Sequence, residues 1–379
     1  MTIKKFAFEV QSSLIKAHGI DLKRSHVHEV LASLLGFASY SALTTQRILG
    51  QHDGRGPAAM LDVTRAAARA VDLGYVPHQP PVIATFVAQR AEAERLAVFT
   101  YDELLAYLGI DISDGKPYEP ADAAVGGDDT ETEEDLERRH NEPPPSIDLE
   151  SAVLRESLLR RAETGSASAH LALAQLDDEF LGFEPADHND GQYWFEQQRS
   201  GRTLSGVELE WAEAYVLRQK ARASREEHLR LAAELGSVEA ALRQAEEDPS
   251  STTFDVAVRV AGPKHAARLG ELALSQGREE QARHWLRVAA QQGDTNAMKT
   301  LASELEPELK DAWTWVYLAE LLGTDAMAYH AVGDDGLPAD ADEAGPLYPA
   351  GGFELDDLPD DVEALVRRRA QELYEALST

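Results

Sequence analysis

Three stretches of this chain repeat nearly the same pattern of residues, and this recurrence limits what the chain can fold into. They occupy residues 158–173, 228–243 and 285–300, and each places a leucine, an alanine, a glycine and a second alanine at matching distances. The matching residues are Leu158, Leu229 and Leu286; Ala162, Ala233 and Ala290; Gly165, Gly236 and Gly293; and Ala169, Ala240 and Ala297. A recurring helix, glycine turn and small-residue helix is typical of stacked helical repeats, in which each unit buries its apolar face against its neighbours. We therefore predict an all-α fold that contains an α-solenoid.

The clearest unit covers residues 265–294. Its first half is expected to form a helix that ends at Gly277, and its second half a helix that ends at Gly293, because glycine is the residue best suited to the left-handed position after a helix. The second helix has the pattern Ala-x-x-Trp-Leu-Arg-x-Ala-Ala-x-x-Gly-Asp, with its tryptophan at Trp285. This unit resembles the Sel1-like repeat, a relative of the tetratricopeptide repeat, and the resemblance extends over residues of about 150–325. It implies paired helices that bind other proteins.

The other copies depart from the pattern of that family. The aligned glycines are 71 and 57 residues apart, whereas the family repeats roughly every 36 to 44 residues. We therefore expect insertions and eroded copies between the clear ones. Trp194 is expected to lie in one eroded helix, and the stretch that contains Trp313 and Trp315 is expected to open a last helix pair.

Composition divides the chain into five predicted parts. Two acidic stretches rich in Gly, Pro and Asp interrupt the helical patterns, and such a composition buries too little apolar surface to offset the entropy lost on ordering. The parts are a helical N-terminal domain at 1–112, an acidic flexible linker at 113–150, a Sel1-like repeat solenoid at 151–330, an acidic loop at 331–357 and a C-terminal capping helix at 358–379.

The N-terminal domain is expected to be built from short helices. One helix is expected to end at Gly36. Ser39 is expected to cap a further helix that extends through Ile48 and Leu49, and a later helix is expected to extend through Leu96.

A capping box marks the start of the next helix in this domain. Thr100 and Glu103 have the spacing at which the threonine hydroxyl and the glutamate carboxylate each satisfy a free backbone N–H. The spacing therefore predicts a helix that begins directly after Thr100.

The net charge of −31 is unevenly distributed. Residues 1–112 hold 11 Lys and Arg against 11 Asp and Glu, so only this segment is neutral enough to approach a phosphate backbone. Its candidate nucleic-acid contacts are Lys4, Lys5, Lys23, Arg24 and Arg47. The acidic remainder favours a basic protein as partner.

Several classes of function have no support in the sequence. The chain has no cysteine, so thiolate chemistry and disulfides are excluded. No Gly-x-Ser-x-Gly or His-Glu-x-x-His pattern occurs. Glu137 and His140 have the spacing of a metal-binding pair, but no second such pair occurs to complete a site. The loop at 340–351 begins like a calcium-binding loop but lacks two of the required ligands. His26 and His28 are predicted to lie on different faces of one helix. We expect no catalysis, cofactor or metal.

A membrane location is also not expected. No run approaches the roughly 18 apolar residues of a membrane helix, and Glu9 interrupts the apolar N-terminal stretch that a secretory signal would need. The protein is therefore expected in the cytoplasm of a bacterial-type cell, without a membrane partner.

These observations predict a non-catalytic adaptor that binds a partner protein through the repeat array. Aromatic side chains dominate the energetics of many interfaces. The candidate partner-binding residues are Trp194, Trp211, Trp313 and Trp315. Two alternatives are a nucleic-acid-associated regulator that uses residues 1–112, and an acidic immunity or antitoxin protein that neutralises a basic toxin.

Overall fold

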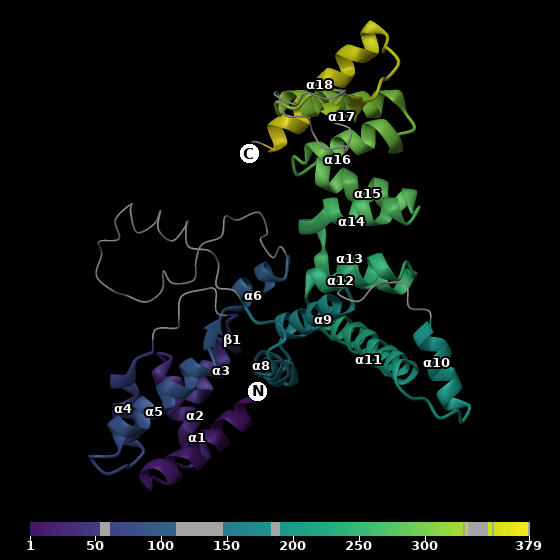
Figure 1. Cartoon of the computed structure of the whole chain (residues 1–379). Helices are drawn as coiled ribbons and strands as arrows, with labels where there is room; N and C mark the ends of the chain where they lie inside the picture. Colours follow the sequence, from purple (N-terminus) through teal and green to yellow (C-terminus); the bar gives the residue numbers. More distant parts are fainter. Residues whose placement is uncertain are drawn as a thin grey trace. The chain divides into compact units, whose positions relative to one another are not determined.

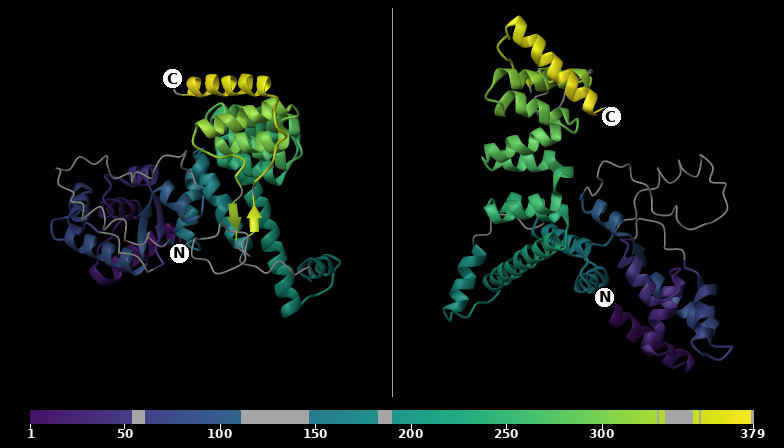
Figure 2. Two further views of the ribbon diagram at one scale, coloured as in Figure 1. Left: turned by 90° about the horizontal axis from the view of Figure 1, so that it is seen from above. Right: turned by 180° about the vertical axis from the view of Figure 1, so that it is seen from behind.

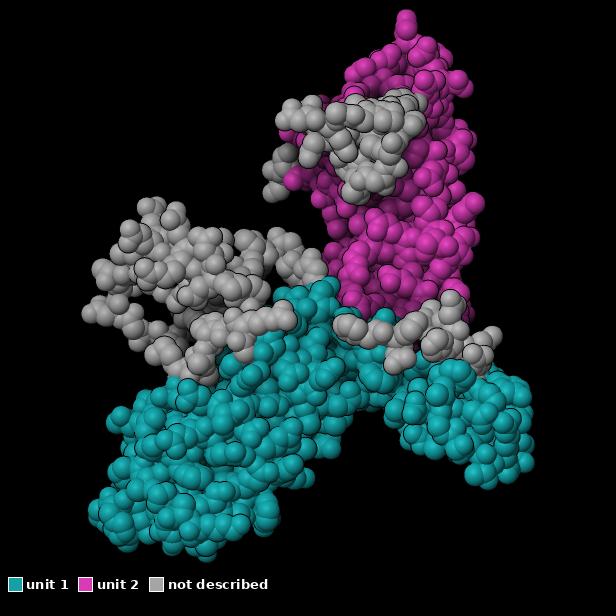
Figure 3. All heavy atoms as spheres, in the orientation of Figure 1, with its two compact units in different colours: residues 1–237 teal, residues 238–379 magenta. Residues whose placement is uncertain are grey.

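The structure is a computed structural model of the whole chain, and it is mostly helical (Figure 1). It describes residues 1–53, 61–110, 147–182, 190–328, 330–332, 348–350 and 352–377. Most of the predicted linker, most of the acidic loop and the candidate metal residues Glu137 and His140 lie outside these ranges. The chain divides into two compact units, Met1–Ser237 (unit 1) and Val238–Thr379 (unit 2), which are coloured separately in Figure 3.

The first five helices of unit 1 place their apolar faces in one core, and a sixth short helix follows them. Phe6, Val10 and Leu14 recur at helical spacing and are fully buried. They pack with Val27 and Leu31 of the second helix in the same cluster. The helices are α1 (Ile3–His18), α2 (Arg24–Leu34), α3 (Tyr40–Gln46), α4 (Val63–Asp72), α5 (Pro80–Ala93) and α6 (Tyr101–Tyr107).

The helix ends in this part of unit 1 follow local sequence signals. Gly36 has a φ of +91° after α2, where a side chain would be strained. The hydroxyl of Ser39 accepts a hydrogen bond from the N–H of Ala42 at 3.1 Å, as expected of an N-cap. The capping box predicted from Thr100 and Glu103 is present with both of its hydrogen bonds.

Two short strands correct the prediction for this region. β1 (Ile48–Gln51) pairs antiparallel with β2 (Leu96–Phe99), so that Ile48 lies opposite Phe99. We predicted helix at Ile48, Leu49 and Leu96, and this was wrong because α3 ends at Gln46 and α5 at Ala93. Short apolar runs do not reveal their structure by periodicity alone, and here each strand depends on a partner far away in the sequence.

The second half of unit 1 holds the first copy of the recurring pattern and the first helix of the second copy. Its helices are α8 (Ala152–Glu163), α9 (Ala167–Gly182), α10 (Asp190–Arg199) and α11 (Val207–Glu234). α9 and α10 both pack on the long helix α11. Gly165, with a φ of +83°, makes the turn from α8 to α9, as the pattern predicted.

Helix α8 is tied to the N-terminal helices by hydrogen bonds. The N–H of Ile3 donates to Glu156 at 2.9 Å, and the guanidinium of Arg160 donates to the hydroxyl of Tyr40 at 2.7 Å. The side chain of Ser151 donates to that of Gln51 in β1 at 2.8 Å. The division between the two units falls after Ser237, inside the predicted 151–330 array.

In unit 2, helices that are neighbours in the sequence pack on one another (Figure 2). The first four are α12 (Val238–Glu247), α13 (Ser251–Ala261), α14 (Ala266–Ser275) and α15 (Glu279–Ala290), with a short 3₁₀ turn (η2, Pro263–His265) before α14. The remaining elements are α16 (Thr295–Thr300), a π-helical turn (η3, Leu301–Leu305), α17 (Leu309–Leu321), the paired strands β3 (His330–Val332) and β4 (Tyr348–Ala350), and α18 (Asp360–Leu377).

The predicted unit at 265–294 forms two helices that approach each other very closely. α14 and α15 are separated at Gly277, and Gly293 follows α15 with a φ of +94°. A Cβ atom placed on Gly270 would lie 2.5 Å from Cγ of Leu286, so no larger residue fits there without displacing α15. This contact explains the glycine in the middle of α14.

No helix in the described part of the chain is long and apolar enough to span a membrane.

A candidate binding cavity between α8, α9 and α11

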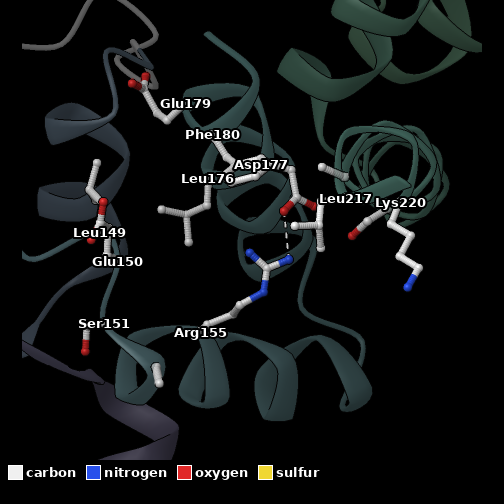
Figure 4. A pocket seen from close by; sticks show the side chains of 13 residues that line it. Leu149, Glu150, Ser151, Arg155, Leu176, Asp177, Glu179, Phe180, Leu217 and Lys220 are labelled. Atoms are coloured by element: carbon white, nitrogen blue, oxygen red, sulfur yellow. Dashed lines mark hydrogen bonds and ion pairs between the residues drawn. The ribbon is translucent and has the colours of Figure 1, made fainter. Parts of the chain in front are cut away.

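A cavity of about 850 Å³ opens in unit 1 between the start of α8, the end of α9 and the middle of α11 (Figure 4). Its size falls within the range of roughly 300–1,000 Å³ that is usual for ligand pockets. Each of its walls comes from a helix that carries part of a recurring stretch, but the lining residues themselves lie outside residues 158–173 and 228–243.

The wall formed by α8 is fixed at its first residue. Ser151 is the N-cap of α8 and is buried, with 3% of its surface exposed. Its hydroxyl accepts a hydrogen bond from the N–H of Leu154 and donates one to Gln51 of β1. Because one side chain both caps the helix and joins it to the strand, this corner of the cavity is held by the core of unit 1.

An ion pair between a half-exposed arginine and a buried aspartate spans the cavity from α8 to α9. Nη2 of Arg155 lies 2.7 Å from Oδ1 of Asp177, which is 2% exposed (Figure 4). The second carboxylate oxygen of Asp177, Oδ2, is buried and accepts no hydrogen bond from any residue within the described ranges. A buried acceptor left without a donor costs about 1–3 kcal/mol. Asp177 therefore lines the cavity with a carboxylate of which one oxygen, Oδ2, has no donor among the described residues.

Two apolar side chains beside this ion pair are exposed to solvent. Leu217 of α11 is 55% exposed and Phe180 of α9 is 47% exposed, and both line the cavity. The side chain of Leu176 adds a buried apolar surface on the same helix as Phe180. Exposed apolar residues around a concave site are typical of surfaces that bind another molecule.

The charged residues of the lining include both signs, with carboxylates in excess. Glu150 precedes α8, and Glu179 lies on α9 beside Asp177. The positive side chains are Arg155 and Lys220, and that of Lys220 is exposed on α11. The charged residues of the lining therefore carry a net charge of −1, from three carboxylates and two cations.

Two histidines join α9 to α11 close to the cavity. Nδ1 of His170 lies 2.9 Å from Nδ1 of His228. His170 precedes Asp177 by seven residues, or about two helical turns, so the two side chains lie on the same face of α9. Burial lowers the pKa of His170, although the carbonyl of Ala162 and the charge of Glu227 oppose this.

The pKa of His228 is lowered in the same direction. Burial is the largest cause, and the positive charges that His170 and Arg155 would place beside it add to the effect. Asp177 and Glu227 act against the shift without reversing it. Both imidazoles are therefore held in the neutral form to lower pH than in an unfolded chain.

The four tryptophans predicted as partner contacts do not line this cavity. The ring of Trp194 on α10 faces the guanidinium of Arg202 at 4.7 Å, and Trp211 is half-buried on α11. Trp313 donates from Nε1 to the carbonyl of Asp356 at 2.9 Å. Trp315 is 6% exposed. The role of these residues as partner contacts stays a prediction.

The basic residues proposed to contact nucleic acid are distributed over three helices of unit 1. Lys4 and Lys5 lie in the first turn of α1, Lys23 and Arg24 at the start of α2, and Arg47 directly after α3. Their role also stays a prediction.

The two histidines of α2 lie on different faces, as the spacing predicted. Nδ1 of His26 lies 2.9 Å from the hydroxyl of Tyr75, whereas His28 stacks on Tyr40 with their ring centres 4.7 Å apart. Within the part of the chain that the structure describes, no group of three His, Asp or Glu side chains is placed to hold a metal ion.

Four residues of the cavity were not predicted from the sequence: Arg155, Asp177, Leu217 and Lys220. The sequence does contain one indication of Asp177. This acidic residue follows His170 and Leu173 at helical spacing and lies with them on the buried face of α9. An acidic residue at a core position of an amphipathic helix indicates either a partner or a functional site.

Comparison with known proteins adds no assignment, since no protein-family model, curated protein or solved structure matches this chain.

Proposed function

We propose that the protein is a non-catalytic adaptor, and that the cavity between α8, α9 and α11 receives a segment of a partner protein. We further propose that the helices from α8 to α17 form a solenoid of Sel1-like helix pairs closed by α18, and that the protein acts in the cytoplasm. The observation that carries the proposal is the cavity itself, in which exposed Leu217 and Phe180 lie beside a buried carboxylate with an unsatisfied oxygen.

A binding role accounts for these features better than a role in folding. An exposed leucine and phenylalanine on the walls of one cavity contribute little to the core of unit 1, but on binding they would bury apolar surface worth roughly 25 cal/mol per Å². Packed helices also hold the walls in place before a partner arrives, which lowers the entropic cost of binding.

The test is capture of the partner by variants of the full-length protein. Tagged wild type, Leu217→Arg and Leu365→Arg are expressed in the native host and isolated with and without nuclease. Leu365 is the matched control because it is an exposed leucine, 63% accessible, on α18 and outside the cavity lining.

We expect one stoichiometric protein to accompany wild type and Leu365→Arg after nuclease treatment, and to be reduced at least roughly tenfold with Leu217→Arg, as for a residue central to an interface. Retention of the same partner by Leu217→Arg would contradict the proposal. Association that disappears with nuclease would instead support a nucleic-acid role for residues 1–112, and a small toxic partner would indicate an antitoxin.

A further inference from the structure

We infer that the cavity between α8, α9 and α11 recognises a basic side chain, an arginine or a lysine, whose positive group binds Oδ2 of Asp177 while its methylene stem packs against Leu217 and Phe180. This inference rests on the proposed function, since it names the chemical feature of the segment that the cavity would receive.

The first support is the unsatisfied oxygen of Asp177. Oδ1 of this residue is bound by Arg155 at 2.7 Å, but Oδ2 is buried without a donor among the described residues. A carboxylate has room for several hydrogen bonds, and those from charged donors are about twice as strong as those from neutral ones. A ligand that brings a charged donor to Oδ2 would therefore supply the partner that the described residues do not provide.

The second support is the charge of the lining. Glu150, Asp177 and Glu179 outnumber Arg155 and Lys220 by one. A single positive group from the ligand makes the lining neutral, whereas a neutral donor leaves one carboxylate uncompensated. The net negative charge of the lining attracts a cation but not a neutral group of the same shape.

The third support is the arrangement of apolar and polar walls. Leu217 and Phe180 are exposed, at 55% and 47%, whereas the carboxylate of Asp177 is buried. Lysine and arginine match this order because they carry a charged head on an apolar stem that packs well on hydrophobic surface. A small inorganic cation would leave the apolar walls uncovered.

The inference is tested with small probes on the full-length chain. The probes are N-acetyl-arginine methylamide, N-acetyl-lysine methylamide and N-acetyl-citrulline methylamide, the last of which has nearly the shape of the arginine compound without its charge. Binding is followed through the methyl NMR signals of Leu176 and Leu217, which both line the cavity.

We expect both cationic probes to shift these signals, and the citrulline probe to bind at least tenfold more weakly. Asp177→Asn should abolish the shifts, because the variant replaces one carboxylate oxygen by an amide and removes the charge. Equal binding of arginine and citrulline probes, or no shift with either cation at saturating concentration, would overturn the inference.

A second pair of variants keeps the test valid if Asp177→Asn fails to fold. Lys220→Gln removes a positive charge from the cavity wall, and Arg222→Gln removes one from an exposed position of the same helix outside the lining. Lys220→Gln should bind the cationic probes several-fold more tightly than wild type, and Arg222→Gln should bind them unchanged. Identical affinities for the two variants would count against recognition of charge in the cavity.

The outcome is distinguishable from failure of the proposed function. If Leu217→Arg loses the partner protein while Lys220→Gln and Asp177→Asn bind it with wild-type affinity, the partner occupies the cavity without a basic side chain. That result would support the adaptor function and contradict recognition of a basic side chain.

Discussion

Nδ1 of His170 and Nδ1 of His228 lie 2.9 Å apart, so these two neutral imidazoles share one proton across the contact between α9 and α11. One ring donates and the other accepts, because a neutral imidazole has one of each. If the accepting nitrogen is protonated as well, both facing nitrogens are donors and the hydrogen bond between them is lost. The contact that holds two walls of the cavity together is therefore sensitive to acid.

Acidification is expected to destabilise unit 1 through this pair. The folded-state pKa of each histidine lies below the ordinary value of 6.5, so the stability that the neutral pair provides is complete above that pH and decreases as the pH falls. The free energy of unfolding, measured in urea by circular dichroism, should fall more between pH 7.5 and pH 5.5 for wild type than for His228→Gln.

The control for this prediction is His78→Gln, because His78 is exposed and separate from the pair. That variant should keep the wild-type dependence on pH. A His228→Gln protein that loses as much stability as wild type on acidification would show that the pair does not sense pH.

Gly270→Ala should destabilise unit 2. The new methyl group would lie 2.5 Å from Cγ of Leu286 and 3.1 Å from its backbone nitrogen, and overpacking of this kind costs about 1–3 kcal/mol. Gly182→Ala is the matched control, because a Cβ at Gly182 meets no atom within 4 Å. Chemical unfolding of both variants measures the difference.

The cause of that loss can be separated from an effect on helix α14 alone. Leu286→Ala removes the atoms that the new methyl group would meet, so the Gly270→Ala, Leu286→Ala double variant should be more stable than the two single effects predict by addition. Strict additivity would mean that the contact between Gly270 and Leu286 does not limit the residue at position 270.

Glu306→Gln should also destabilise unit 2. The side chain of Glu306 is fully buried; it accepts hydrogen bonds from Arg287 of α15, at 2.7 Å from Nε, and from Nε1 of Trp315 of α17, at 3.0 Å. Hydrogen bonds to charged groups contribute about 1.5–3 kcal/mol, so a loss of this order is expected in urea unfolding. Exposed Glu304→Gln should be neutral.

The same residue predicts a second dependence on pH. Burial alone would raise the pKa of Glu306, but the hydrogen bonds from Arg287 and Trp315 outweigh it and the net pKa is lowered. The stability that ionised Glu306 contributes is therefore fully present above the ordinary carboxyl pKa of 4.5. It is lost as the pH falls through the lowered pKa of Glu306. Below pH 4.5, Glu306→Gln should lose less stability than wild type.

The helix ends could be predicted from the sequence because their signals are local. Thr100 and Glu103 satisfy each other's neighbouring backbone groups within four residues, and Gly277 and Gly293 provide the left-handed turns after their helices. The strands could not be predicted in this way. Ile48 and Phe99 pair across 51 residues of chain, and nothing in either short run indicates the other.

The candidate site was less predictable than the fold. Its walls come from three helices, so Arg155, Asp177 and Leu217 are far apart in the sequence and meet only through the packing of α8 and α11 on α9. Tryptophans were the partner contacts predicted from the sequence, because aromatic residues often dominate interfaces. In unit 2, Trp315 is instead committed to an internal hydrogen bond with Glu306.

The most direct test of the central proposal is photo-cross-linking in the native host, with a benzophenone amino acid placed at Leu217 or at Arg222 of full-length protein. Both positions are exposed on α11, but only Leu217 lines the cavity. We predict that position 217 cross-links to one protein that position 222 does not capture. Equal cross-linking at the two positions, or none at position 217, would contradict a binding site between α8, α9 and α11.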